Sequence, residues 1–179
     1  MNTLSIIFLI FLLLIAVISD IRSYRIPNKL ILLGVVIGII SSVVFVGRAS
    51  TIDLTDAILG FCIGLIIFLP LHIFCAMGAG DVKLIAMIGT FVGPIAILQI
   101  SFYTVIAGGI LAISVLICGG RLTELINFLK ILLLKFQLTT IAGNSITIPV
   151  DQALPRSNNK LPYGVAIAAG TIFHLVINL

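Results

Sequence analysis

The sequence has very few charged residues. Asp, Glu, Lys and Arg make up 9% of its 179 residues, whereas 61% are hydrophobic; soluble domains carry about 25% charged residues. This scarcity excludes a soluble globular domain of any size. The chain is predicted to be an all-α membrane protein that crosses the lipid bilayer several times, with residues 1–179 forming a single membrane-embedded domain.

Paired cysteines are also missing. Cys62, Cys75 and Cys118 lie singly inside apolar stretches, and no Cys-x-x-Cys pair is present. This pattern gives no support for a zinc site or a disulfide framework, so we expect no metal and no cofactor. The cysteines are predicted to be small buried hydrophobic residues. Aromatic residues do not alternate with the basic ones, which argues against a nucleic-acid partner.

The sequence has long apolar segments instead. A helix needs roughly 17–25 apolar residues to cross a bilayer core of about 30 Å. Six segments meet this length and predict six transmembrane helices, at about 3–19, 30–46, 57–77, 82–98, 100–118 and 161–177. The fourth and fifth segments are almost continuous, so the turn between them must come from either Gly93-Pro94 or Gln99-Ile100-Ser101.

The basic residues fall almost entirely on one side of this arrangement. Nine of the ten lie in the loops after the first, third and fifth predicted helices, and only Arg48 lies in a loop on the other side. Because loops rich in Lys and Arg face the cytoplasm, both termini are predicted to lie on the non-cytoplasmic side. The same arrangement places Asp20 and Asp81 at cytoplasmic helix ends.

Two further features complete the predicted architecture. Residues 121–137 carry a polar or charged residue at every third to fifth position, which predicts an amphipathic helix on the cytoplasmic interface. Residues 138–160 predict a polar loop, and the sequence assigns no role to the whole stretch 121–160. Close packing between helices of the chain, or alternatively a dimer contact, is predicted by the pairs Gly34/Gly38, Gly60/Gly64 and Gly89/Gly93. The oligomeric state is left open.

Two acids stand out in this apolar sequence. Even on a mild insertion scale a carboxylate in mid-helix costs roughly 2.5–3.5 kcal/mol, so Asp20 and Asp81 need an explanation. Singly, Asp81 could cap a helix after a glycine turn, and Asp20 could be an ordinary interfacial charge. Together, two carboxyl groups that share a proton and a water molecule can hydrolyse a peptide bond without a metal, as in aspartic proteases.

The residues around Asp81 fit such a site. Gly78 and Gly80 allow backbone conformations closed to other residues and are expected to leave room for a substrate strand. Asp81 would lie near the N-terminus of a helix, where the helix dipole favours negative charge. Lys83 would either hold a carboxylate or extend to the membrane interface.

Three motifs, in this order, resemble those of the prepilin peptidases, which are membrane aspartic proteases of the Gly-x-Gly-Asp type. Asp20 precedes a loop with Ile26-Pro27-Asn28, Asp81 stands in Gly78-Ala79-Gly80-Asp81-Val82-Lys83, and Pro162-Tyr163-Gly164 resembles the opening of the last helix in this family. The resemblance implies that Asp20 and Asp81 are the catalytic pair. The supporting residues it implies are Pro27, Asn28, Gly78, Gly80 and Lys83.

The resemblance also implies a substrate and a location. Prepilin peptidases remove the short leader of type IV pilin-like precursors at the cytoplasmic face of the cell membrane. Long members of the family carry an N-terminal domain with paired Cys-x-x-Cys motifs and also methylate the new N-terminus. This sequence begins directly with its first helix and resembles the short forms for Flp/Tad-type pilins or archaeal-type filaments, so no methyltransferase activity is expected.

Two other functions are considered. A small transporter or channel subunit could use the acids as an ion or proton site, although transporters often show internal repeats and none is visible here. A presenilin-type protease would pair the second acid with a Tyr-Asp motif, but Ser19 precedes Asp20 in this sequence.

Overall fold

The computed structural model describes residues 3–44, 52–73, 77–118 and 163–178. These residues form the helices α1 (Thr3–Ser23), α2 (Asn28–Val44), α3 (Leu54–Ile73), α4 (Ala79–Cys118) and α6 (Tyr163–Asn178). The chain divides into two compact units, Met1–Gly109 with Leu161–Leu179, and Ile110–Lys160. The predicted amphipathic helix 121–137 and the predicted loop 138–160 lie outside the described residues.

The helices are apolar enough for a membrane protein. α1, α3 and the part of α4 from Ala79 to Val115 are long enough to cross a bilayer, and α2 and α6 are apolar helices of 17 and 16 residues. The all-α prediction therefore holds for the described residues. They contain five helices rather than the six predicted, because the fourth and fifth predicted spans belong to one element, α4.

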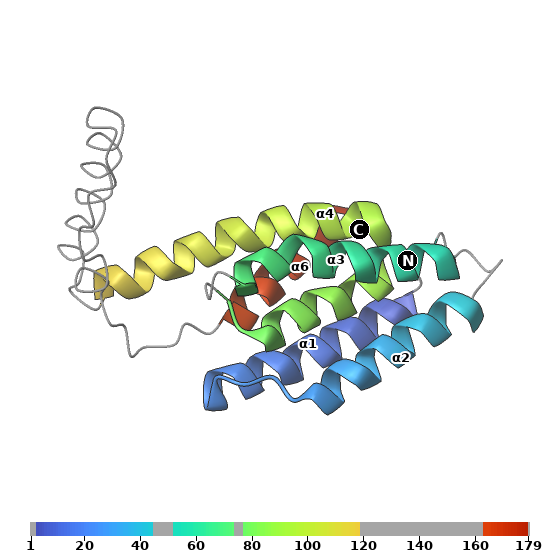
Figure 1. Cartoon of the computed structure of the whole chain (residues 1–179), viewed down its shortest axis with the longest axis horizontal. Helices are drawn as coiled ribbons and strands as arrows, with labels where there is room; N and C mark the ends of the chain where they lie inside the picture. Colours follow the sequence, from blue (N-terminus) through green and yellow to red (C-terminus); the bar gives the residue numbers. More distant parts are fainter. Residues whose placement is uncertain (1–2, 45–51, 74–76, 119–162, 179) are drawn as a thin grey trace, which may run out of the picture. The chain divides into compact units, whose positions relative to one another are not determined.

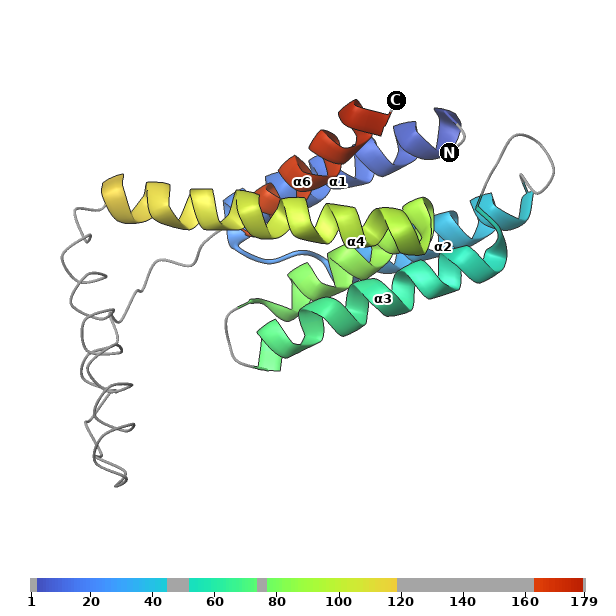
Figure 2. The ribbon, with the colours of Figure 1, turned by 90° about the horizontal axis from the view of Figure 1, so that it is seen from above.

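α4 is interrupted at Gly93. This residue has φ 80° and ψ −178°, outside the helical region, and glycine reaches a positive φ at no steric cost. Pro94 then opens the second arm of α4, where the missing N–H would have no helical partner in any case. Figures 1 and 2 show the chain reversing direction at this break. Of the two predicted turns, Gly93-Pro94 is the one observed, and Gln99-Ile100-Ser101 is helical.

The first arm of α4 (residues 79–92) forms the core of the unit Met1–Gly109 with Leu161–Leu179. Every residue from 84 to 92 is buried. Glycines on α2 make room for it, because a Cβ added to Gly34 would meet the side chain of Met87 and one added to Gly38 would meet Thr90. The side chains of the first arm of α4 thus occupy the places that side chains of α2 would otherwise fill.

α3 approaches the same arm even more closely. A Cβ on Gly60 would meet the carbonyl oxygen of Gly89, and a Cβ on Gly64 would lie 3.1 Å from the Cα of Ala86. The backbones of α3 and α4 are in direct contact here, and only glycine, which has no side chain, permits this. The Gly-x-x-x-Gly pairs on α2 and α3 therefore pack within the chain, as predicted, and not against a second copy.

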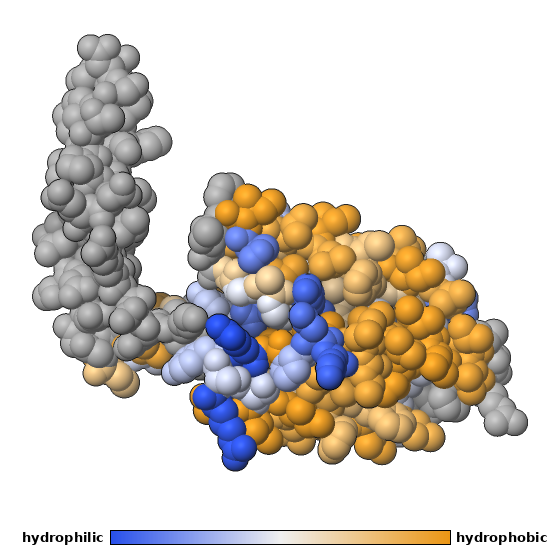
Figure 3. All heavy atoms as spheres, turned by 60° about the horizontal axis from the view of Figure 1, so that its bottom comes forward, coloured by the Kyte–Doolittle hydropathy of each residue, from blue (hydrophilic) through white to orange (hydrophobic). Residues whose placement is uncertain are grey.

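The outer faces of the helices are hydrophobic. Large apolar side chains such as Ile7, Leu32, Ile66 and Phe102 are each more than 60% exposed. In Figure 3 this apolar surface covers most of the visible face, and hydrophilic residues gather toward one end. Cys62 and Cys118 are also exposed, so their predicted burial is wrong; Cys75 lies outside the described residues.

One end of this unit brings together several helix ends. α1 packs against α2 and α6, and α2 packs against α3. The C-terminal end of α1 and the N-terminal ends of α2, α4 and α6 lie at the same end in Figure 1. The described residues of the three sequence motifs lie at or next to these helix ends.

Replacing Gly60 by alanine is expected to lower the free energy of unfolding by about 1–3 kcal/mol, the usual range for overpacking. The new Cβ meets backbone atoms of Gly89, which cannot rotate away. Gly109→Ala is the control, because nothing lies within 4 Å of a Cβ there and alanine favours a helix by about 1 kcal/mol. Thermal unfolding in detergent measures both variants; equal Tm values would contradict the close contact of α3 with α4.

Candidate active site

Asp81 lies buried in the first turn of α4. The carbonyl oxygen of Gly78 accepts hydrogen bonds from the N–H groups of Asp81 (3.1 Å) and Val82 (3.4 Å), so Gly78 caps the helix. The Asp81 carboxylate in return accepts a hydrogen bond from the Gly78 N–H. The bond from the Asp81 side chain back to the N–H of the N-cap residue is one half of a capping box, because Gly78 has no side chain to supply the other half. It fixes the carboxylate at the positive end of the helix dipole, as predicted.

The two glycines of this motif lie close to the acid and to the loop between α1 and α2. Among the described glycines only Gly93 has a positive φ, so Gly78 and Gly80 do not use the conformational freedom that glycine allows. A Cβ on Gly78 would lie 3.0 Å from Asp81 Oδ2, and one on Gly80 would lie 3.4 Å from the Cβ of Ile26. The absent side chain at Gly78 thus leaves room for the Asp81 carboxylate, whereas a Cβ at Gly80 would lie at ordinary contact distance from Ile26 in the loop between α1 and α2.

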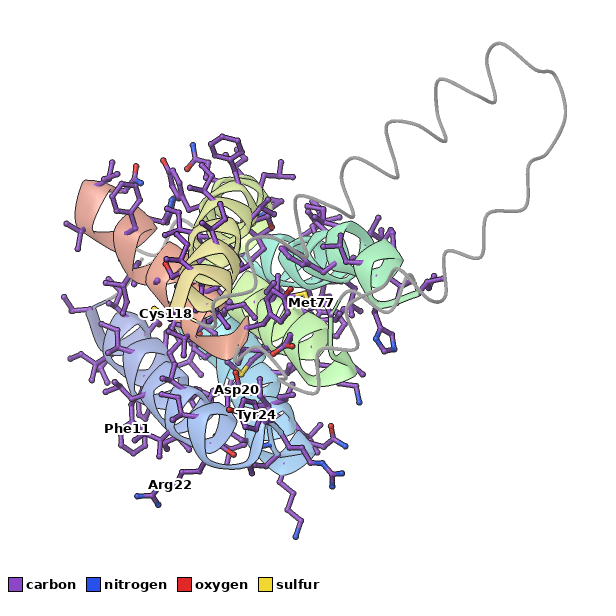
Figure 4. All side chains as sticks on the ribbon, turned by 90° about the vertical axis from the view of Figure 1, so that its left-hand side faces the viewer. Phe11, Asp20, Arg22, Tyr24, Met77 and Cys118 are labelled. Atoms are coloured by element: carbon purple, nitrogen blue, oxygen red, sulfur yellow. The ribbon has the colours of Figure 1, made fainter. Side chains whose placement is uncertain are left out.

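Asp20 lies in the last turn of α1 and is 5% exposed. The C-terminal end of a helix carries partial negative charge, so its own helix disfavours this carboxylate. The start of α6 compensates, because the Gly164 N–H donates a hydrogen bond of 2.8 Å to Asp20 Oδ2. Figure 4 shows Asp20 turned into the bundle while Arg22, two residues later, points away from it.

The structure brings the two acids into one site. Asp20 and Asp81 are 5% and 8% exposed, and they lie near enough for the charge of Asp20 to act on Asp81. Each carboxylate accepts a hydrogen bond from a backbone N–H at the start of a helix. Because two like charges in an apolar setting repel each other, the pair is suited to hold one proton between two carboxyl groups.

Pro27, Asn28 and Lys83 hold the starts of α2 and α4 at this end of the bundle. The Pro27 carbonyl caps α2 by accepting hydrogen bonds from the N–H groups of Leu30 and Ile31. Lys83 Nζ donates to Asn28 Oδ1 at 3.3 Å. The predicted role of Lys83 in holding a carboxylate is therefore not what is observed, since its partner is an amide oxygen that ties α4 to α2.

The third motif reaches the site through α6. Tyr163 opens this helix and is half-buried, and a Cβ on Gly108 would lie 3.8 Å from its ring. Gly164 follows, and a Cβ there would lie 2.8 Å from Asp20 Oδ2. A side chain at this position would displace the carboxylate, so its absence is required. Pro162 lies outside the described residues.

Sequence reasoning missed the importance of Ile26. It is 9% exposed, although Tyr24, Arg25 and Pro27 around it are all exposed. A signal was present, since Ile26 is an apolar residue inside a short polar loop between two membrane helices. Its contact with Gly80 places it next to Asp81.

A cavity of about 450 Å³ lies at the opposite end of the bundle from the acids. Its lining includes Ile6, Asp56, Gln99 and His174. The stretch of α1 from Ile6 to Asp20 rises about 21 Å along the helix, so the cavity is separate from the acidic pair. Neither the cavity nor the rest of the described chain holds three or more His, Cys, Asp or Glu side chains grouped to hold a metal ion.

Residues 7–113 match the model of the type IV leader peptidase family. The match covers more than half of the chain and includes both acids with their flanking motifs. The chain belongs to the type IV leader peptidase family. Membership indicates a protease and favours this function over a transporter or channel subunit. Neither a curated protein nor a solved structure matches the chain.

The site of this leader peptidase extends beyond the matched residues. α6 lies outside residues 7–113, yet its Gly164 binds Asp20. The third sequence motif is thus part of the same site as the first two.

Replacing Gly164 by alanine is expected to lower peptidase activity about 10²-fold, because a displacement of about 1 Å at a reacting group has this effect. The new Cβ would take the place of the Asp20 carboxylate and weaken its hydrogen bond. Gly108→Ala is the control in the α4–α6 contact, since its Cβ has no neighbour nearer than 3.8 Å. Leader cleavage per folded enzyme measures the effect; similar rates for both variants would argue against this role of Gly164.

Proposed function

We propose that Asp20 and Asp81 are the catalytic pair of an aspartic endopeptidase that removes the leader of type IV pilin-like precursors. One observation carries the proposal: two buried carboxyl groups from different helices lie together in an apolar bundle, each with a helix-start N–H as its donor. Membership of the type IV leader peptidase family supports both the reaction and the class of substrate.

The reaction needs one proton shared by the pair and one water molecule. The ionised carboxyl takes a proton from the water as its oxygen attacks the scissile carbonyl carbon. The protonated carboxyl gives its proton to the carbonyl oxygen, so that a neutral tetrahedral intermediate forms. As the intermediate collapses and its C–N bond breaks, the protonated carboxyl gives its proton to the leaving amine. The ionised carboxyl takes a proton from a hydroxyl of the intermediate, which restores one shared proton. This chemistry needs no metal and no cofactor.

The membrane position proposed for the site follows from the charges around it. Arg22, Arg25 and Lys29 are exposed at the end of the bundle that holds the acids, and basic residues of this kind mark the cytoplasmic side. With the two arms of α4 counted separately, six spans leave both termini on the non-cytoplasmic side. The apolar segment of the precursor would then stay in lipid while its leader reaches the acids from the cytoplasm.

The substrates to be tested first are Flp/Tad-type pilin precursors. Their recognition would depend on two parts of the precursor, the leader and the apolar helix that follows it. If a precursor of another type IV class is cut at a higher rate under the same conditions, that class is the preferred substrate. The proposed chemistry would stay the same.

Asp20→Asn and Asp81→Asn are each expected to lower precursor cleavage by about 10²–10⁴-fold, the usual contribution of a general acid or base. Both amides keep the shape of the carboxyl group and its hydrogen bond to the helix start. Asp53→Asn is the matched control, because Asp53 is exposed at the start of α3. Co-expression with a precursor and immunoblotting of the membrane fraction measure cleavage. Normal cleavage by either Asn variant of the catalytic pair would mean that the replaced aspartate takes no part in the mechanism.

The rate of cleavage is expected to depend on pH as a bell-shaped curve. At low pH both carboxyl groups are protonated and no base remains; at high pH both are ionised and no acid remains. The activity is therefore maximal at intermediate pH and is lost in both directions. Initial rates on a purified precursor in detergent, across a range of pH values, give the profile. A rate that rises steadily to a plateau would indicate a single base rather than a pair.

A further inference from the structure

The α1–α2 loop (residues 24–27) is tied firmly to the end of α1. The Tyr24 N–H donates a 2.8 Å hydrogen bond to the Asp20 carbonyl oxygen, and Tyr24 has a positive φ of 50°. This is the αL ending of a helix, a position that glycine usually occupies. The chain therefore leaves α1 through a turn that is hydrogen-bonded to the backbone carbonyl of residue 20.

Two serines hold the next part of the loop. Ser19 Oγ donates to the Arg25 carbonyl oxygen at 2.8 Å; Ser23 Oγ donates to the Ser19 carbonyl oxygen at 2.8 Å and also lies 3.3 Å from the Arg25 carbonyl oxygen. The backbone between Asp20 and Ile26 is therefore fastened to α1 at two points. A displacement of Ile26 is transmitted to the last turn of α1, where Asp20 lies.

The far side of the loop docks on the first turn of α4. Ile26 is 9% exposed, and its Cβ would lie 3.4 Å from a Cβ added to Gly80, the residue before Asp81. The hydrogen bond from Lys83 to Asn28 fastens the start of α2 to the same turn of α4. The contact of Ile26 with Gly80 thus lies between the element that carries Asp20 and the element that carries Asp81.

We propose that Ile26 is a positioning residue, whose contact with Gly80 sets the distance between the carboxyl groups of Asp20 and Asp81. The consequence for catalysis rests on the proposed function, whereas the consequence for the distance does not. A smaller side chain at position 26 lets the end of α1 move relative to the first turn of α4. The carboxyl pair then spends less time at the separation that one bridging water requires.

The kinetic experiment compares Ile26→Ala with Ile31→Ala. Ile31 is the same residue type, is 6% exposed and belongs to the same hydrophobic cluster, so the loss of packing is matched. Ile26→Ala is expected to lower kcat about 10–100-fold with KM changed less than about twofold. Ile31→Ala is expected to lose a similar amount of thermal stability with kcat changed less than about threefold. Ile26→Val, which keeps the branched Cβ but is one methylene smaller, is expected to give a kcat between those of the wild type and Ile26→Ala.

Equal losses of kcat in the two alanine variants would mean that Ile26 only contributes to packing, and this would overturn the proposal. Should Ile26→Ala fail to fold, Ile26→Val and Ile31→Val give the same comparison with a smaller loss of volume. An intermediate rate for Ile26→Val, with wild-type kcat for Ile31→Val, supports positioning; equal rates overturn it.

A second measurement reports the distance without any activity. In a chain with Cys62, Cys75 and Cys118 replaced by serine, Asp20→Cys and Asp81→Cys are combined and treated with bifunctional thiol reagents of increasing length. The shortest reagent that links the pair is expected to link at least fivefold less in the presence of Ile26→Ala, and to the same extent in the presence of Ile31→Ala. Unchanged linking with Ile26→Ala would overturn the proposal.

The two measurements separate the possible failures. Altered linking together with normal cleavage by Asp20→Asn would keep Ile26 as the residue that sets the distance and would reject the catalytic pair. Loss of cleavage in both Asn variants together with unaltered linking would keep the pair and reject the role of Ile26.

Discussion

The close packing of α3 against the first arm of α4 is the constraint on which the rest of the structure depends. Gly60 and Gly89 bring two helix backbones into direct contact, and Gly34 and Gly38 admit side chains of the same arm on the α2 side. With larger residues at these places, residues 84–92 could not be buried. Asp81 begins this arm, so the packing of glycines places an acid at the end of a buried helix.

Hydrogen bonds to their carboxylates explain how the two acids are tolerated at these buried helix ends. Asp81 accepts a hydrogen bond from the residue that caps its own helix, whereas Asp20, at the wrong end of α1 for a negative charge, is stabilised by the start of α6. The break at Gly93 also contributes to this arrangement of helices. It ends the buried arm after about four turns and turns the chain back, so that the second arm of α4 meets α6 where Gly170 faces Thr104.

The sequence predicted the parts of the site that depend on local signals. The Gly-Ala-Gly-Asp order predicted a helix start with an acid in its first turn, and the placement of Lys and Arg put Asp20 and Asp81 on one face. The sequence could not show whether Gly93-Pro94 or Gln99-Ile100-Ser101 forms the turn, because both interrupt an apolar run. The choice depends on how long the buried first arm of α4 is, which is a tertiary property. The hydrogen bond from Gly164 to Asp20 and the burial of Ile26 are tertiary contacts, which no local pattern encodes. The order Gly-Ala-Gly also could not show that Gly78 has no positive φ and instead leaves space beside the Asp81 carboxylate.

The bond between Asp20 and Gly164 has a consequence for the order in which the molecule is assembled. The two residues are 144 positions apart, so a ribosome that has already delivered α1 to the membrane must make most of the remaining chain before this donor exists. Until then, Asp20 stands at the unfavourable end of its own helix without α6. The complete pair is thus a property of the finished chain, and a nascent or truncated one has both aspartates without the environment that holds them.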